Sequence, residues 1–151
     1  MLIAAIGNRF RSDDGVAWQV ADAVRRDLSP NVRVVYAVDV LSIVDDWRGE
    51  DLAILIDAVQ SGAPPGTVHE IDATGRLSAP IPAHASTHDL ELPHAIELAR
   101  RLDRLPAKLI VVGIEGHRFD YGDELSPAVA AAVPRAAAVL RRLAVDGLQR
   151  S

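Results

Sequence analysis

Short apolar runs alternate with amphipathic stretches along this chain. Four of the runs contain few polar positions and predict buried strands at residues 2–6, 32–38, 52–59 and 108–114. The last three are rich in Val and Ile and alternate little, which is typical of strands covered on both faces. A fifth run at 66–72 follows the turn-rich sequence SGAPPG and alternates better, so it predicts an edge strand.

Apolar positions at three- and four-residue spacing predict helices between these strands. The predicted helices span residues 14–28, 40–49, 91–104 and 126–148. In the last helix Ser126 is a suitable N-cap and Pro127 fits the first helical position, while Gly147 lies where a C-cap would end the helix. Strands that alternate with helices indicate an α/β fold, a three-layer sandwich around a mainly parallel sheet.

Composition and charge narrow the class of protein. The 151 residues suit one domain, and no linker or repeat divides them. The net charge is −5 and the basic residues are scattered, so the positive stripe of a nucleic-acid-binding protein is missing. No apolar run approaches the roughly 18–20 residues of a membrane span, and no basic n-region precedes the first run. There is no cysteine, so we expect a cytoplasmic protein without disulfides, thiolate chemistry or a membrane partner.

Polar side chains follow the predicted strands at their carboxyl ends, where open α/β sheets bind ligands. These residues are Asn8, Asp13, Asp14, Asp39, Asp57, Glu115 and His117. Asp57 interrupts the apolar run LAILIDAV, where a carboxylate costs several kcal/mol unless it is paired. It either accepts hydrogen bonds from a neighbouring loop or has a metal-binding or catalytic role.

The adjacent acids Asp13 and Asp14 precede a predicted helix. One carboxylate suffices to cap the helix, which leaves the other to face the cleft. His88, in HASTHDLELPHAIELARRL, lies beside the start of another predicted helix, where its imidazole can reach the same strand ends. Two carboxylates and an imidazole from separate loops suit Zn, Ni, Mn or Fe. Water activation by an aspartate and metal-assisted hydrolysis are both compatible with these residues.

Four segments occur in the order found in a known family. They are IGNRFRSDDGVA (6–17), ILIDAVQSGAPPGTVHEID (54–72), ASTHDLELPHAIELAR (85–100) and VVGIEG with LSPAVAAAVP (111–134). In this order and spacing the chain resembles the hydrogenase maturation proteases over nearly its whole length. The resemblance implies a phosphorylase/hydrolase-like fold, with a five-stranded twisted sheet of order 2-1-3-5-4 whose fourth strand is antiparallel.

The resemblance also implies an activity and a site. The family's proteases trim a C-terminal extension from the large-subunit precursor of a nickel–iron hydrogenase after nickel insertion. Their metal-contacting residues correspond to Asp14, Asp57 and His88, which would contact the nickel already held by the substrate. In an alternative assignment, an aspartate is the general base and nickel serves recognition only. Further candidates for the lining of the cleft are Asn8, Asp13, Asp39 and Glu115.

Two other functions are compatible with these residues. A peptidyl-tRNA hydrolase also opens with a strand and Gly-Asn, but it needs a catalytic histidine in the first loop, where this chain has RSDDG. A non-catalytic nickel-binding assembly factor could keep the same pocket and cut nothing. The chain also departs from the family in DVLSIVDDW, which replaces a Gly-Thr-rich loop after the second strand and leaves the target hydrogenase open.

Overall fold

A five-stranded sheet forms the centre of the molecule in the computed structural model, which describes residues 1–74 and 91–150. Its strands are β1 (Leu2–Ile6), β2 (Arg33–Ala37), β3 (Leu52–Val59), β4 (Val68–Asp72) and β5 (Lys108–Glu115). They lie in the order β2-β1-β3-β5-β4. All pairs are parallel except β4 with β5. The expected strand order and the antiparallel edge strand are confirmed.

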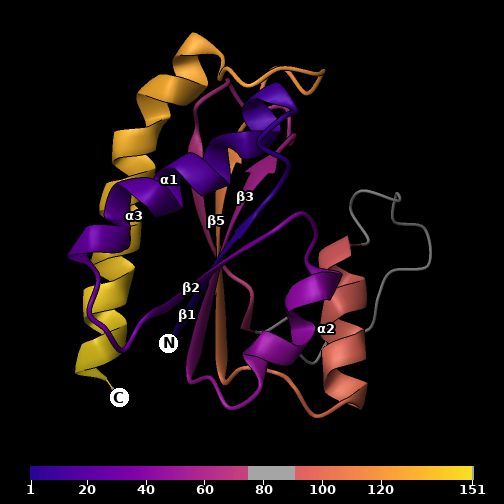
Figure 1. The fold of residues 1–151 in the computed structure, drawn as a ribbon. Coiled ribbons are helices and arrows are strands. Elements are labelled where there is room, and N and C mark those ends of the chain that lie inside the picture. The colour runs from indigo at the N-terminus through magenta and orange to yellow at the C-terminus, as the bar shows by residue number, and fades with distance from the viewer. Residues whose placement is uncertain (75–90, 151) are drawn as a thin grey trace.

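Helices cover both faces of this sheet (Figure 1). On one face lie α1 (Val16–Val24) and α3 (Pro127–Gln149), and on the other lie the 3-10 helix η3 (Leu41–Trp47) and α2 (Glu91–Arg101). Two short 3-10 helices, η1 (Ser12–Gly15) and η2 (Arg25–Asp27), flank α1. The three-layer α/β sandwich is therefore confirmed. Among the helices that the structure describes, none is long and apolar enough to cross a membrane.

Two hydrophobic cores lie on opposite faces of the sheet, because successive strand residues point to opposite sides. On β3, Ile54 and Ile56 join the core beneath α1 and α3, while Ala53 and Leu55 join the core beneath η3 and α2. Residues of β5 divide between the same two cores. Both strands are therefore covered on both faces, as their apolar runs predict.

The run at 32–38 is less buried than its apolar pattern predicts. It forms β2 at the edge of the sheet, where Arg33 is exposed and Val34, Val35 and Tyr36 are only partly buried. Val34 packs on one core and Val35 on the other, so β2 is covered on both faces as expected, but less completely than β3 and β5 because it lies at the edge. Val-rich runs are favoured in any strand because β-branched side chains fit a pleated surface, so they do not by themselves report burial.

Helix α3 begins where the sequence predicts and ends later than predicted. Ser126 is its N-cap residue and Pro127 its first helical residue, but the Ser126 side chain makes no capping hydrogen bond and donates instead to Asp13. At the other end the helix runs past Gly147 to Gln149, so the expected C-cap at Gly147 is wrong. A Cβ at Gly147 would crowd Met1 and Leu52, and the glycine therefore allows close packing.

Candidate functional site

Asp57 lies at the carboxyl edge of the sheet, the edge at which the parallel strands β1, β2, β3 and β5 end. Ile56 pairs with Ala5 of β1, so Asp57 is level with Ile6, the last residue of that strand. On its other side Asp57 pairs with Gly113 of β5. The alternation along β3 directs the half-buried Asp57 side chain to the face covered by η3 and α2.

The loop after β1 is a tight turn closed by its own residues. The Asn8 backbone N–H donates to Asp14 Oδ2 at 2.8 Å, and the Asn8 side-chain oxygen accepts from the Phe10 N–H at 2.9 Å. Gly7 has a φ of +139°, and a Cβ there would overlap the Asp14 carbonyl oxygen. Asp14 is half-buried, and among the described residues its Oδ1 accepts no hydrogen bond. One oxygen of this carboxylate thus fixes the turn while the other is available to a ligand.

Asp13 points the other way and is fully buried. Its Oδ2 accepts from the backbone N–H groups of His117 and Arg118 and from the Ser126 hydroxyl, each at 2.8 Å, and its Oδ1 accepts from the Ser126 N–H at 2.7 Å. Burial alone would raise the pKa of this carboxyl, but the backbone and hydroxyl donors outweigh it and lower the pKa. Asp13 therefore joins the loop after β1 to the loop after β5 and to the start of α3.

Glu115, the last residue of β5, is also buried and bonded. It accepts hydrogen bonds from the Ser61 N–H at 2.8 Å and from the Ser61 hydroxyl, and His69 Nε2 lies 3.2 Å from its Oε1. Its pKa is lowered because these donors outweigh the effect of burial, which acts to raise it. Glu115 is 2% exposed, so it holds the β3–β4 loop in place and, like Asp13, does not line an open cleft.

The other two candidates for the cleft lining stabilise local turns. Asn8 forms the turn after β1 described above. Asp39 is exposed, and its Oδ1 accepts from the Ser42 N–H at 2.8 Å at the start of η3. Asp39 follows β2, the strand on the far side of β1 from β3. Both residues thus lie at the carboxyl edge.

His88, the third expected metal ligand, lies outside the described residues. Within residues 1–74 and 91–150, no three His, Asp or Glu side chains gather closely enough to hold a metal ion. The sheet brings the ends of β1 and β3 together, and η1, which contains Asp14, contacts β3. The described part of the site therefore consists of Asp57 on β3 and Asp14 in η1, the 3-10 helix that follows the turn after β1.

Comparison with known proteins identifies the family of the chain. The sequence model of the family described as "Hydrogenase maturation protease" matches residues 20–142, most of the chain. The chain belongs to this family of proteases. The hydrogenase expression/formation protein HupD of Thiocapsa roseopersicina is 27% identical over 135 residues, which are 85% of this chain and 60% of HupD. The chain thus spans less than two thirds of the length of that relative.

Solved structures of hydrogenase maturation proteases share the fold. The maturating endopeptidase HybD from E. coli is 23% identical, with a TM-score of 0.76 over 93% of this chain and 91% of that chain. The maturation protease HybD from Thermococcus kodakarensis is 27% identical, with a TM-score of 0.69 over 95% of this chain and 97% of that chain. The matches cover nearly all of each chain, so the architecture of this molecule is that of the family.

Sequence reasoning missed the residues that hold the site in shape. Ser126 was expected only as a helix cap, yet it makes two of the four hydrogen bonds to Asp13. Ser61 and His69 were not connected with Glu115, although all three converge at the start of the β3–β4 loop and the adjoining strand ends. No local motif indicates these contacts, because the partners are 46 to 113 residues apart in the chain.

Proposed function

We propose that this protein is an endopeptidase that removes the C-terminal extension of a nickel–iron hydrogenase large-subunit precursor after nickel has been inserted. Nickel enters as part of the substrate. Asp14, Asp57 and His88 recognise the metal, so that only a loaded precursor is cut. Membership of the maturation protease family supports this proposal.

The observation that carries the proposal is the position of Asp14 and Asp57 in a chain of this family. Asp57 is level with the end of β1, and Asp14 lies in the turn that follows β1. His88 precedes the first residue of α2 by three positions, and α2 covers the face toward which Asp57 points. Asp14 and Asp57 thus belong to elements that meet at the carboxyl edge, and His88 is close in sequence to the helix that covers the adjoining face.

These side chains suit the chemistry. Carboxylate and neutral imidazole ligands are compatible with nickel, and ligands from three segments distinguish a loaded precursor from an empty one. One of the two aspartates takes a proton from the attacking water, whose oxygen adds to the scissile carbonyl carbon. The carbon–nitrogen bond of that peptide then breaks, and the departing amine takes up a proton.

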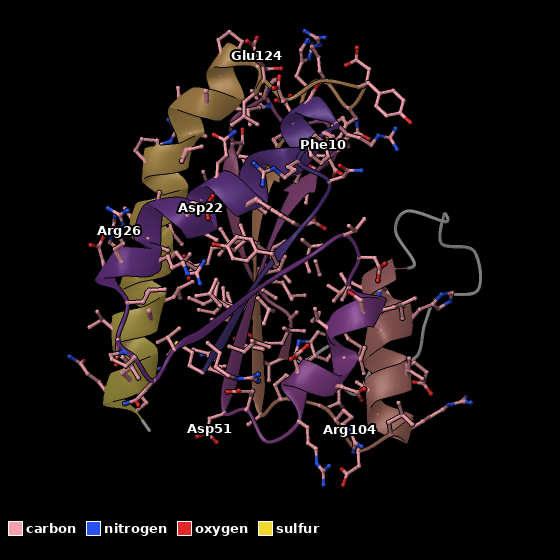
Figure 2. All side chains as sticks on the ribbon, in the orientation of Figure 1. Phe10, Asp22, Arg26, Asp51, Arg104 and Glu124 are labelled. Atoms are coloured by element: carbon pink, nitrogen blue, oxygen red, sulfur yellow. The ribbon has the colours of Figure 1, made fainter. Side chains whose placement is uncertain are left out.

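Mass spectrometry of the nickel-loaded precursor tests this function. We expect wild-type protein to shorten the precursor at its C-terminus, and Asp57→Asn or His88→Ala to do so at least about a hundredfold more slowly. The matched control is Asp51→Asn, an exposed residue just before the opposite end of β3, which should leave the rate unchanged (Figure 2). Full activity of both the Asp57 and His88 variants would contradict the site.

The same preparations separate the competing functions. An assembly factor would bind the loaded precursor and leave its mass unchanged. A peptidyl-tRNA hydrolase would release the peptide from peptidyl-tRNA at a robust rate. We expect neither result, because the chain matches the maturation proteases over residues 20–142 and its basic residues are scattered along the sequence.

A further inference from the structure

Two aromatic side chains are strongly exposed beside the candidate site. Phe10 is 63% exposed and Tyr121 is 89% exposed. Their backbones are joined, since the Gly122 N–H donates to the Phe10 carbonyl at 2.9 Å and the Ser12 N–H donates to the Gly122 carbonyl at 2.8 Å. The rings are therefore presented by a fixed backbone, although water surrounds them. Exposed aromatic groups on a rigid support are typical of protein-binding positions.

Two arginines flank Phe10 in the sequence RFR. The Arg9 guanidinium lies 5.7 Å from the centre of the Phe10 ring and 5.8 Å from that of Trp18. Arg11 Nε donates to the Phe119 carbonyl at 3.2 Å. Among the described residues neither arginine forms an ion pair, whereas the neighbouring Arg118 pairs with Asp120 at 3.3 Å. Two uncompensated positive charges thus lie beside exposed rings on a chain of net charge −5.

This combination defines the chemistry of a partner. Aromatic rings bind apolar side chains, and guanidinium groups that have no ion-pair partner bind carboxylates. Figure 2 shows Phe10 on the loop at the carboxyl edge and the acidic Glu124 near the start of α3. The complementary ligand is therefore a polypeptide segment that has both apolar and acidic side chains.

We propose that Arg9, Phe10, Arg11 and Tyr121 form a docking rim for such a segment of the precursor, next to the bond that is cut. The inference rests on the proposed function, because it takes the precursor as the partner. Its structural basis is that Phe10 and Asp14 belong to the same closed turn, in which the Asn8 N–H donates to Asp14 and the Asn8 side-chain oxygen accepts from the Phe10 N–H. Tyr121 is held beside this turn by the hydrogen bond from the Gly122 N–H to the Phe10 carbonyl. A segment bound on the rim lies directly beside the candidate carboxylates.

Steady-state cleavage of the nickel-loaded precursor tests the rim. The variants are Phe10→Ser with Tyr121→Ser, and Arg9→Gln with Arg11→Gln. We expect KM to rise about tenfold in each pair while kcat and the melting temperature stay near wild type. The control pair is Leu98→Ser with Val145→Ser, which are 41% and 53% exposed on α2 and α3 and should leave KM unchanged. Added salt should raise KM for the wild type and less so for the arginine variant.

The outcomes distinguish failure of the docking rim from failure of the proposed function. If the wild type cuts the precursor and both variant pairs cut it with unchanged KM, the rim is overturned and the proposed function stands. If the wild type cuts nothing, the proposed function fails and the rim fails with it. A wild-type dimer that the serine variants convert to monomers would assign the rings to self-association and would also overturn the proposal. A loss of folding in the serine pair leaves the arginine pair as the deciding variant.

Discussion

The adjacent residues Asp13 and Asp14 differ in their surroundings: Asp13 holds loops together, and Asp14 belongs to the candidate site. Asp13 is buried and accepts four hydrogen bonds from the loop after β5 and the start of α3, whereas Asp14 accepts one from Asn8. Adjacent residues in a turn point in different directions, so two neighbouring acids can serve different partners. The aspartate that stabilises the loop is therefore distinct from the aspartate proposed to contact nickel.

Replacing Asp13 with asparagine should destabilise the protein. The new amide places an NH₂ group opposite donors that need an acceptor, which we expect to lower the free energy of unfolding by about 2–3 kcal/mol. Urea unfolding measures the loss. The control is Asp123→Asn in the same loop, because Asp123 is exposed and its carboxylate has no hydrogen bond or ion pair among the described residues. Equal stability of Asp13→Asn and wild type would contradict the role of Asp13.

Stability should also depend on pH through Asp13. The folded-state pKa of this carboxyl lies below its usual range, so its contribution is fully present above the ordinary pKa of about 4 and is lost as the pH falls through the lowered pKa. The difference in unfolding free energy between wild type and Asp13→Asn should therefore shrink from about pH 6 to about pH 3. Unfolding curves at both pH values measure it. A constant difference would show that the charge of Asp13 is not what stabilises the loops.

Sequence reasoning could identify the two acids but could not rank them by local pattern. Either residue can cap a helix, and the partners of Asp13 come from His117, Arg118 and Ser126, more than 100 residues further along the chain. The family resemblance implies that Asp14 is the metal-contacting acid, which leaves Asp13 a structural role. The burial of Asp13 supports that structural role. The role of Asp14 itself remains a proposal.

Among the elements, the β3–β4 connection is fixed most tightly at Gly66. Gly66 has a φ of +85°, its N–H donates to the Glu115 carbonyl at 2.8 Å, and its own carbonyl accepts from Arg135 Nη2 at 2.7 Å. A Cβ at this position would overlap the carbonyl oxygen of Ala128 in the first turn of α3. The connection therefore packs backbone against backbone.

Two glycine substitutions in this connection should differ in their effect. Gly62 has a φ of +91°, but no atom lies within 4 Å of an added Cβ. Gly62→Ala should therefore lower the free energy of unfolding only by the strain of a left-handed residue, about 1–2 kcal/mol. Gly66→Ala adds a steric clash with α3, so it should lower the free energy of unfolding by roughly 1–3 kcal/mol more than Gly62→Ala does. Thermal or urea unfolding compares the two variants. Equal losses would contradict the close contact between Gly66 and Ala128.

At the scale of elements, the apolar runs predict where strands and helices lie more reliably than how they are covered. The runs at 2–6 and 52–59 match β1 and β3 at both ends. The apolar run overestimates the burial of β2, because valine favours strands at the edge of a sheet as well as at its centre. The predicted end of α3 is too early because a glycine at position 147 is typical of a C-cap. In the structure Gly147 lies inside the helix, and its lack of a side chain allows close contact with Met1 and Leu52.

In the whole molecule, sheet order brings distant motifs to one edge. The alternation of strands and helices predicts the α/β class, but the position of β1 between β2 and β3 followed from the family resemblance and is confirmed by the pairing. This order places Asp57 level with the end of β1. The bonds from Asp13 and Glu115 then fix the loops around the carboxyl edge, and these contacts depend on tertiary packing that no sequence pattern reports.

The central claim is that cleavage requires nickel in the precursor and the carboxylates of Asp14 and Asp57 in this protein. Its most direct test is the intact mass of one precursor, prepared with and without nickel, after incubation with the wild-type protein. We expect loss of the C-terminal extension from the nickel-loaded precursor and an unchanged mass for the nickel-free precursor. Equal shortening of both precursors, or no shortening of either, would contradict this claim.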